Sequence, residues 1–238
     1  MNLLDNNGVL DEALAAGWIS NGTFNYVSHI QSAIRNTGDT ILRDQQCLQY
    51  FVPPVHANHL KCADYVYRYY VDSNKTYLNI GAGCGYVEKV FKDHGHNGIK
   101  GCDWQPTDWY FDYWRRYFGV EDKLTHDSGD LLNTEWEIRN RENGNILDVK
   151  FDSIIALRFN GWWRSEDTWK AHPRPFEEVL QFFRAAKKYA PEMFVLILGL
   201  DSPEKFTDES RNWILDNTIE KYKNGSPHFW ATISLDNV

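Results

Sequence analysis

A stretch with three alternate glycines constrains this chain more than any other. Residues 77–80 have the bulk and β-propensity of a buried strand, and Gly81, Gly83 and Gly85 follow at once. From Tyr86 the apolar residues take helical spacing. Glycines between a strand and a helix N-terminus permit positive φ angles and a close approach of backbone to ligand, where the helix presents N–H groups. The stretch therefore predicts a ligand-binding turn.

The chain after residue 75 alternates strands with helices, which is the rhythm of an α/β fold with a mostly parallel sheet. Besides 77–80, we expect strands at 98–103, 123–126, 151–158, 193–200 and 229–235, and helices at 86–95, 106–118, 176–190 and 207–223. Residues 133–150 are charged, contain Asn143-Gly144, and predict a hairpin or surface excursion.

Residues 1–74 hold no glycine motif and predict helices near 9–17, 24–36 and 55–72. We therefore expect an N-terminal helical extension or lid over 1–74 and an α/β domain over 75–238. His56 and His59 lie one helical turn apart, but no third ligand is evident nearby, so we predict no metal site.

A carboxylate at the end of the second expected strand gives the turn a partner. Asp103 follows Gly81 by 22 residues, the length of a glycine turn, a helix and the next parallel strand. That offset brings Asp103 beside the turn, where it can accept from both hydroxyls of a ribose. Trp104 then falls where an adenine ring on that ribose would stack. Asp130, past the third strand, is preferred to Asp127 as acceptor for the adenine amino group. The alternative for Asp103 is a solvated or helix-capping aspartate.

Aromatic and basic residues gather after the strand at 151–158. Within residues 158–175 they are Arg158, Trp162, Trp163, Arg164, Trp169, Lys170, His172 and Arg174. Ligands of open α/β sheets bind outside the carboxyl ends of the strands, so this segment is expected to form the far wall of the site. In an acidic chain this local positive charge favours a flat or ring-shaped acceptor that can be anionic. A surface loop held by its own tryptophans is the alternative.

The composition sets the class of protein and excludes several partners. With 42% hydrophobic and 24% charged residues the chain is expected to be globular, and no stretch has the length of a membrane span. The first sixteen residues carry no basic residue, unlike a signal peptide, and the four cysteines form no CxxC pair, so we expect a cytoplasmic protein with reduced thiols. A net charge of −8 without a basic block makes nucleic acid an unfavoured partner.

Four motifs in order carry a family resemblance. They are Leu78-Asn-Ile-Gly-Ala-Gly-Cys-Gly85, Cys102-Asp103, Gly129-Asp130 and Asp152-Ser-Ile-Ile-Ala-Leu157, and over roughly residues 75–200 they resemble the class I S-adenosylmethionine-dependent methyltransferases. The resemblance implies a Rossmann-like, doubly wound sheet of seven strands that binds S-adenosylmethionine at the glycine turn. The cofactor-binding residues then expected are Asn79, Gly81, Ala82, Gly83, Cys84, Gly85, Asp103, Trp104, Asp130 and Arg158.

The chain departs from the family pattern at three places. Asn79 stands where the family usually has an acid, which weakens one contact with the amino group of the cofactor. Only one strand is expected after Lys223 where the family has two, so the sheet is expected to be shortened. The Asn-Pro-Pro-Tyr type of motif of nucleic-acid amino methylation is missing, since residues 158–162 read Arg-Phe-Asn-Gly-Trp. Methylation of a small molecule is therefore favoured over methylation of a base.

The resemblance implies a reaction in which the protein mainly aligns an acceptor with an activated methyl group. Arg158 and Asn160 are the expected positioning groups. His126 is the candidate for a general base, with His172 and His56 as alternatives.

Two other functions compete with this one. A dinucleotide-dependent oxidoreductase needs a third glycine at position 86, where this chain has Tyr86. A catalytically silent module or partner subunit that binds the cofactor without turnover would be consistent with Asn79.

Overall fold

The computed structural model describes residues 53–104, 109–120, 124–126, 137–157, 175–197, 199–201, 203, 206–222 and 229–238, with isolated positions between 11 and 28. The side chains of 53–58, 104, 109–113 and 125–126 lie outside that description. The chain divides into two compact units, of which unit 1 is Met1–Val71, Cys84–His94 and Asp108–Glu121, and unit 2 is Asp72–Gly83, Gly95–Thr107 and Asp122–Val238. A boundary between 1–74 and 75–238 remains a prediction.

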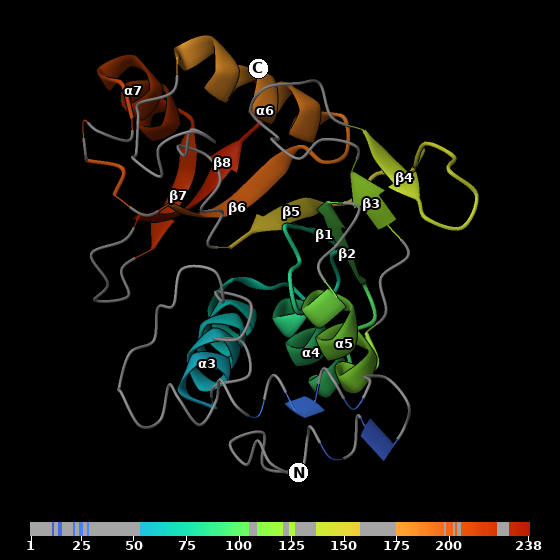
Figure 1. Ribbon diagram of the computed structural model, residues 1–238. Helices are drawn as coiled ribbons and strands as arrows, with labels where there is room; N and C mark the ends of the chain where they lie inside the picture. Colours follow the sequence, from blue (N-terminus) through green and yellow to red (C-terminus); the bar gives the residue numbers. More distant parts are fainter. Residues whose placement is uncertain are drawn as a thin grey trace. The chain divides into compact units, whose positions relative to one another are not determined.

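Unit 2 is built on one sheet, to which the described residues contribute eight strands in the order β4-β3-β2-β1-β5-β6-β8-β7 (Figure 1). The strands are β1 Tyr77–Ile80, β2 Ile99–Trp104, β3 Leu124–His126, β4 Ile138–Asn140, β5 Ser153–Ala156, β6 Glu192–Ile197, β7 Thr218–Tyr222 and β8 Phe229–Ser234. Strands β3, β2, β1, β5 and β6 are parallel, whereas β4 and β8 run antiparallel to their neighbours. This is the mostly parallel, Rossmann-like sheet that the sequence predicts, with eight strands in place of the seven that the resemblance implies.

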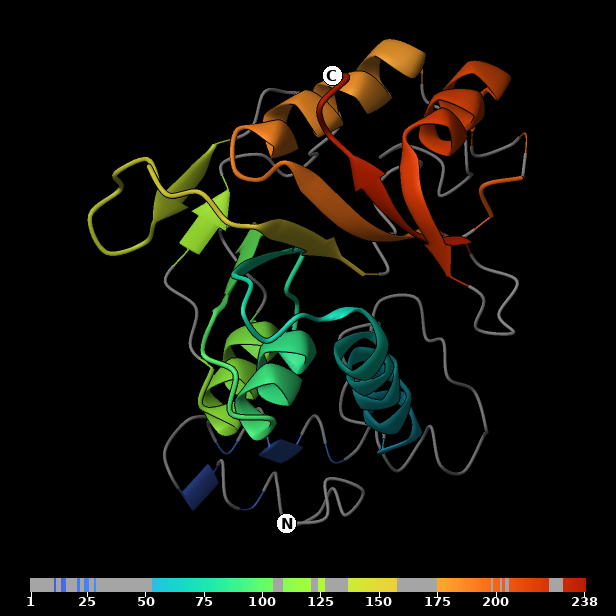
Figure 2. The ribbon, with the colours of Figure 1, turned by 180° about the vertical axis from the view of Figure 1, so that it is seen from behind.

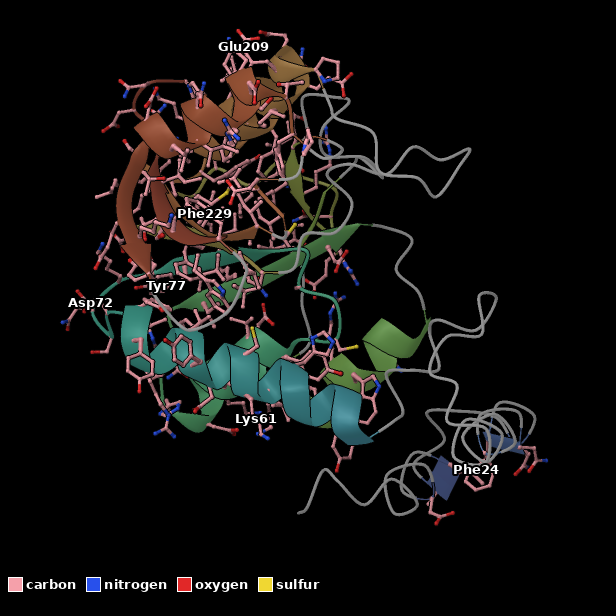
Figure 3. The ribbon with its side chains drawn as sticks, turned by 90° about the vertical axis from the view of Figure 1, so that its left-hand side faces the viewer. Phe24, Lys61, Asp72, Tyr77, Glu209 and Phe229 are labelled. Atoms are coloured by element: carbon pink, nitrogen blue, oxygen red, sulfur yellow. The ribbon has the colours of Figure 1, made fainter. Side chains whose placement is uncertain are left out.

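Two helices of unit 2, α6 (Phe176–Lys187) and α7 (Asp208–Asp216), lie on the same face of the sheet in both Figure 1 and Figure 2. Alternate strand residues point to that face because the side-chain period of a strand is two. The core between them includes Leu78, Ile80, Cys102, Ile154, Ala156, Met193, Val195, Ala231 and Ile233 from the strands and Phe182, Phe183 and Ile214 from the helices. Figure 3 shows Phe229 within this layer and Glu209 of α7 at the outside.

The two strands at the end of the chain correct the prediction for residues 207–223. The helix expected there is wrong in its second half, because α7 ends at Asp216 and β7 begins at Thr218. The side-chain amide of Asn217 donates to the Trp213 carbonyl at 2.9 Å and closes the helix. With β7 paired to β8, two strands follow the last helix, so the expected shortening of the sheet is also wrong.

The excursion at residues 133–150 contains the predicted hairpin. The chain leaves β4, turns through Gly144 at a φ of 72°, and returns alongside the strand. The N–H of Asn140 donates to the Asn145 carbonyl at 2.9 Å, and the N–H of Leu147 donates to the Ile138 carbonyl at 2.7 Å. The return chain therefore covers the outer edge of β4.

Unit 1 contains α3 (Pro53–Tyr70), α4 (Tyr86–Asp93) and α5 (Trp109–Phe118). The Tyr67 ring of α3 packs edge-on against the Phe91 ring of α4, with 4.9 Å between the ring centroids. Trp114 of α5 is buried. The helix predicted at 55–72 is thus confirmed, whereas those predicted near 9–17 and 24–36 fall largely outside the described residues. Among the helices of the described chain, none has the length and apolar character needed to cross a lipid bilayer.

Candidate functional site

Strand β1 ends at the topological switch point of the sheet. The chain continues from β1 to β2 and β3 on one side, while β5 and β6 extend the sheet on the other side. In open α/β sheets, ligands bind outside the carboxyl ends of the strands at such a point. The glycine turn directly follows β1, so the sheet places the predicted ligand-binding turn where such folds bind their ligands.

The glycines of the turn adopt a backbone that other residues rarely take. The φ angles are 70° at Gly81, 53° at Gly83 and 79° at Gly85. A Cβ in this left-handed region costs roughly 1–2 kcal/mol per residue. The alternate glycines of the sequence are therefore required by the conformation of the turn.

The first half of the turn is hydrogen-bonded to the end of β2. The N–H groups of Gly81 and Ala82 donate to the Cys102 carbonyl at 2.9 and 3.1 Å. The next N–H, that of Gly83, donates to Oδ2 of Asp103 at 2.5 Å. Three successive N–H groups of the turn are thus used within the protein, and the carboxylate of Asp103 lies directly against the turn.

Asn79 and Asp103 share one face of the sheet. Cys102 belongs to the core under α6 and α7, so its neighbours Gly101 and Asp103 point to the opposite face. Asn79 pairs with Gly101 in the β1–β2 register and points to the same face. The Asn79 side chain is 2% exposed, whereas Asp103 is partly exposed. An amide and a carboxylate therefore stand at the carboxyl ends of neighbouring strands, with no side chain at Gly101 between them.

The second half of the turn belongs to unit 1, where the chain enters α4. Cys84 is 1% exposed, and Gly85 precedes the first helical residue, Tyr86. The Tyr86 ring stacks on the ring of His59 in α3, with 4.9 Å between the ring centroids, and packs against the ring of Phe118 in α5, with 5.8 Å between the centroids. The position that a dinucleotide fingerprint gives to a small third glycine is here filled by a packed aromatic ring.

Two charged residues that the sequence analysis did not select lie at Gly85. A Cβ built on Gly85 would stand 3.3 Å from Cγ of Arg115 and 3.7 Å from Oε2 of Glu88. Arg115 is 2% exposed and Glu88 is 6% exposed. The sequence offered one sign of these residues: each helix carries a charged residue among its apolar ones, with Glu88 after Val87 and Arg115 after Trp114.

Several predicted site residues fall outside the described part of the chain. Asp130, Arg158 and Asn160 lie there, as do the alternatives Asp127 and His172, so their roles remain predictions. Trp104 and His126 are the last residues of β2 and β3. Both therefore stand at the same end of the sheet as the glycine turn.

The site can accept hydrogen bonds more readily than it can bind an anion. A carboxylate held at the turn repels phosphate groups, and the N–H groups that could cradle a phosphate already donate to β2. Hydroxyl and amino groups suit such a site, since an ionised carboxylate offers about four lone-pair positions.

Comparisons with known proteins give structural likenesses only. No protein-family model and no curated protein matches the chain. It is similar in structure to an O-methyltransferase family protein from Burkholderia thailandensis, at 12% identity and a TM-score of 0.49, over 86% of this chain and 62% of that one. It is also similar to the ribosomal protein L11 methylase of Lactobacillus delbrueckii subsp. bulgaricus, at 13% identity and a TM-score of 0.42, over 75% and 77% of the two chains.

A third likeness is to PigF in complex with SAH, at 14% identity and a TM-score of 0.44, over 75% of this chain and 65% of that one. The chain spans about three fifths of the length of the O-methyltransferase structures that it matches. In its glycine turn, its spaced carboxylate and its mostly parallel sheet, the chain resembles the class I S-adenosylmethionine-dependent methyltransferases.

Proposed function

We propose that this protein is an S-adenosylmethionine-dependent methyltransferase whose acceptor is a small, ring-containing molecule that can carry negative charge. The observation that carries the proposal is the carboxylate of Asp103 against the glycine turn. It accepts from Gly83, and a carboxylate at this place suits a pair of ribose hydroxyls, because each carboxylate oxygen can accept more than one hydrogen bond. A cofactor with a nucleoside and a positively charged sulfur matches such a site.

A dinucleotide cofactor fits the same residues poorly. Its diphosphate needs N–H donors at the turn, but those of Gly81, Ala82 and Gly83 donate to β2. Its charge would also face the Asp103 carboxylate. Tyr86, whose ring stacks on His59, stands at the position of the third glycine that the dinucleotide fingerprint requires. These three features favour a ligand without phosphate at the turn.

The residues that would hold S-adenosylmethionine are those of the turn and the ends of β1 and β2. The backbone of residues 81–85 would lie against its amino-acid part, the Asn79 amide would orient the turn, and Asp103 would accept from the ribose. Trp104 and Asp130 are proposed for the adenine. When bound, the cofactor supplies a methyl group that its positively charged sulfur already activates.

The chain itself then has to orient the acceptor and handle a proton. Arg158 and Asn160 are proposed to position the acceptor, and His126, at the end of β3, to take a proton from it. The ring and the negative charge of the acceptor follow from the aromatic and basic residues within 158–175, which suit stacking and charge-assisted hydrogen bonds.

A second function is favoured by the amide at position 79. Asn79 is buried at the end of β1, so the turn has one carboxylate fewer than the family pattern implies. A module that binds the cofactor and transfers no methyl group would tolerate this loss. The two functions differ in turnover and share the binding site.

The test begins with calorimetric titration of the purified protein with S-adenosylmethionine and with its demethylated product. Both ligands are expected to bind, and Gly83→Val is expected to abolish binding because it places a branched side chain at a φ of 53°. Gly144→Val, at a φ of 72° in the hairpin, is the matched control and should bind normally. Normal binding by Gly83→Val would refute the site.

Turnover is tested separately by following the demethylated product over a panel of acceptors. Aromatic acids and phenols are expected to react, with neutral aliphatic alcohols as the contrasting set. Binding without turnover on any acceptor would support the silent module and would refute the enzyme.

A further inference from the structure

We infer that Glu88 and Arg115 are positioning residues for the glycine turn and that their opposite charges set how strongly the turn discriminates a cationic ligand from a neutral one. The inference rests on the proposed function, and it concerns residues that the motifs of the family resemblance do not include. It is carried by where these two side chains lie in unit 1.

Both side chains reach Gly85, the last residue of the turn. A Cβ built on Gly85 would lie 3.7 Å from Oε2 of Glu88, an ordinary van der Waals distance, and 3.3 Å from Cγ of Arg115, which is tighter than ordinary contact. Cγ2 of Val120 is closer still, at 2.8 Å from the same point. Gly85 is therefore enclosed by its neighbours, and a shift of Arg115 or Glu88 changes the room available to the turn.

The charged groups are shut off from solvent. Oε2 of Glu88 and the Nε and Nη1 atoms of Arg115 have almost no accessible surface. Burying one charge costs several kcal/mol unless an opposite charge compensates it. The carboxylate of Glu88 and the aliphatic stem of Arg115 reach the same glycine from α4 and α5, so the two opposite charges offset one another in part near the turn.

Removal of one charge shifts the balance of charge near the turn toward the other. In Glu88→Gln the guanidinium of Arg115 loses a compensating carboxylate, and its field disfavours a positively charged sulfur. In Arg115→Met the carboxylate of Glu88 remains and favours that charge. Interactions between charges inside a protein are screened far less than in water, so the effect is expected to be about three- to tenfold in relative affinity.

The ligand pair for the test is S-adenosylmethionine, a sulfonium cation, and S-adenosylhomocysteine, the neutral thioether. The quantity measured is the ratio of their two dissociation constants, obtained by calorimetry for the wild type and each variant. Glu88→Gln should raise the ratio of the S-adenosylmethionine constant to the S-adenosylhomocysteine constant, and Arg115→Met should lower it. The double variant should return near the wild-type ratio, since both charges are gone.

A purely structural role predicts something else. If Glu88 and Arg115 only support the fold, their variants weaken both ligands by the same factor and leave the ratio unchanged, which would overturn the inference. Asp93→Asn is the matched control, because it removes a carboxylate from the exposed side of the same helix, where Asp93 pairs with Lys89. It should leave the ratio unchanged.

The outcomes separate this inference from the proposed function. A wild type that binds neither ligand refutes the proposed function, and the inference falls with it. A wild type that binds both, with variants that keep its ratio, refutes the inference alone. If Arg115→Met does not fold, Glu88→Gln, which keeps the shape of the side chain, decides the matter by the direction of its ratio.

Discussion

The backbone N–H of Gly83 donates to Oδ2 of Asp103 at 2.5 Å, so one carboxylate serves both the shape of the glycine turn and the proposed ribose contact. Asp103→Ala removes both functions and is expected to weaken S-adenosylmethionine binding by about 100-fold or more, while Asp103→Asn, which can still accept from Gly83, is expected to weaken it by about tenfold. Calorimetric titration measures both constants. Equal losses in the two variants would contradict the double role.

Gly85 gives a second prediction, about stability. Gly85→Ala adds a Cβ at a φ of 79° and 2.8 Å from Val120, so strain and overpacking together are expected to cost about 2–4 kcal/mol of unfolding free energy. Urea denaturation measures this cost. Gly144→Ala is the matched control: its φ is 72°, nothing lies within 4 Å of the added carbon, and only about 1 kcal/mol should be lost.

The neighbour of Gly85 offers a rescue experiment. In the background of Gly85→Ala, the further change Val120→Ala should recover part of the lost stability, because it removes the closest contact. Strictly additive losses would show that Val120 is not the source of the clash.

A substitution at Asn79 is expected to raise the affinity for S-adenosylmethionine. Asn79→Asp restores the acid that the family pattern implies and should tighten binding of S-adenosylmethionine by about three- to tenfold, because a hydrogen bond from an amino group to a carboxylate is stronger than one to an amide. Methylthioadenosine, which lacks the amino-acid part, serves as the control ligand and should bind both proteins alike. Weaker binding of S-adenosylmethionine would contradict a contact with the amino group.

The ion-pair cluster between α3 and α4 predicts a pH dependence. Asp64 receives hydrogen bonds from His94 at 3.1 Å and from Arg68 at 2.6 Å. Burial raises the pKa of Asp64. The hydrogen bonds from His94 and Arg68, with the charges of these groups, together lower it by a larger amount, so the pKa of Asp64 lies below its ordinary value of 3.8. The folded state therefore holds this carboxylate ionised more readily than the unfolded state does.

The stability from Asp64 is present above about pH 4 and is lost as pH falls through the lowered pKa. Asp64→Asn should therefore be less stable than the wild type at pH 7, and the difference should shrink below pH 3.8. Urea denaturation at several pH values measures it. Because Asp64 and His94 are about one third exposed and Arg68 is 62% exposed, 1 M salt should also shrink the difference, and a difference independent of salt and pH would contradict the ion pairs.

The sequence predicted the parts of the fold that depend on local patterns. The strand and glycines at 77–85 and the hairpin at Gly144 are local, because φ angles and alternation are properties of a few residues. The end of α7 was missed because an apolar pattern continues past Asp216, while the strand character of 218–222 appears only when β8 is there to pair with it.

The site shows the same division. The spacing of Asp103 from Gly81 predicted that the carboxylate reaches the turn, and the β1–β2 register brings it there. Its bond to the Gly83 N–H depends on that register to within one residue, which spacing does not determine. Glu88 and Arg115 both reach Gly85 only through the packing of α4 and α5, which no sequence motif describes.

The position of β1 in the middle of the sheet also determines when its surroundings can be completed during synthesis of the chain. Its neighbour β2 follows soon after it, but β5 comes much later. The hydrogen bond that the Thr76 N–H donates to Oδ2 of Asp152, at 2.7 Å, joins residues separated by 76 positions. Contacts of such large sequence separation form slowly because a long loop has to close first. A ribosome-bound chain that ends before Asp152 therefore has its glycine turn already translated but supported on one side only.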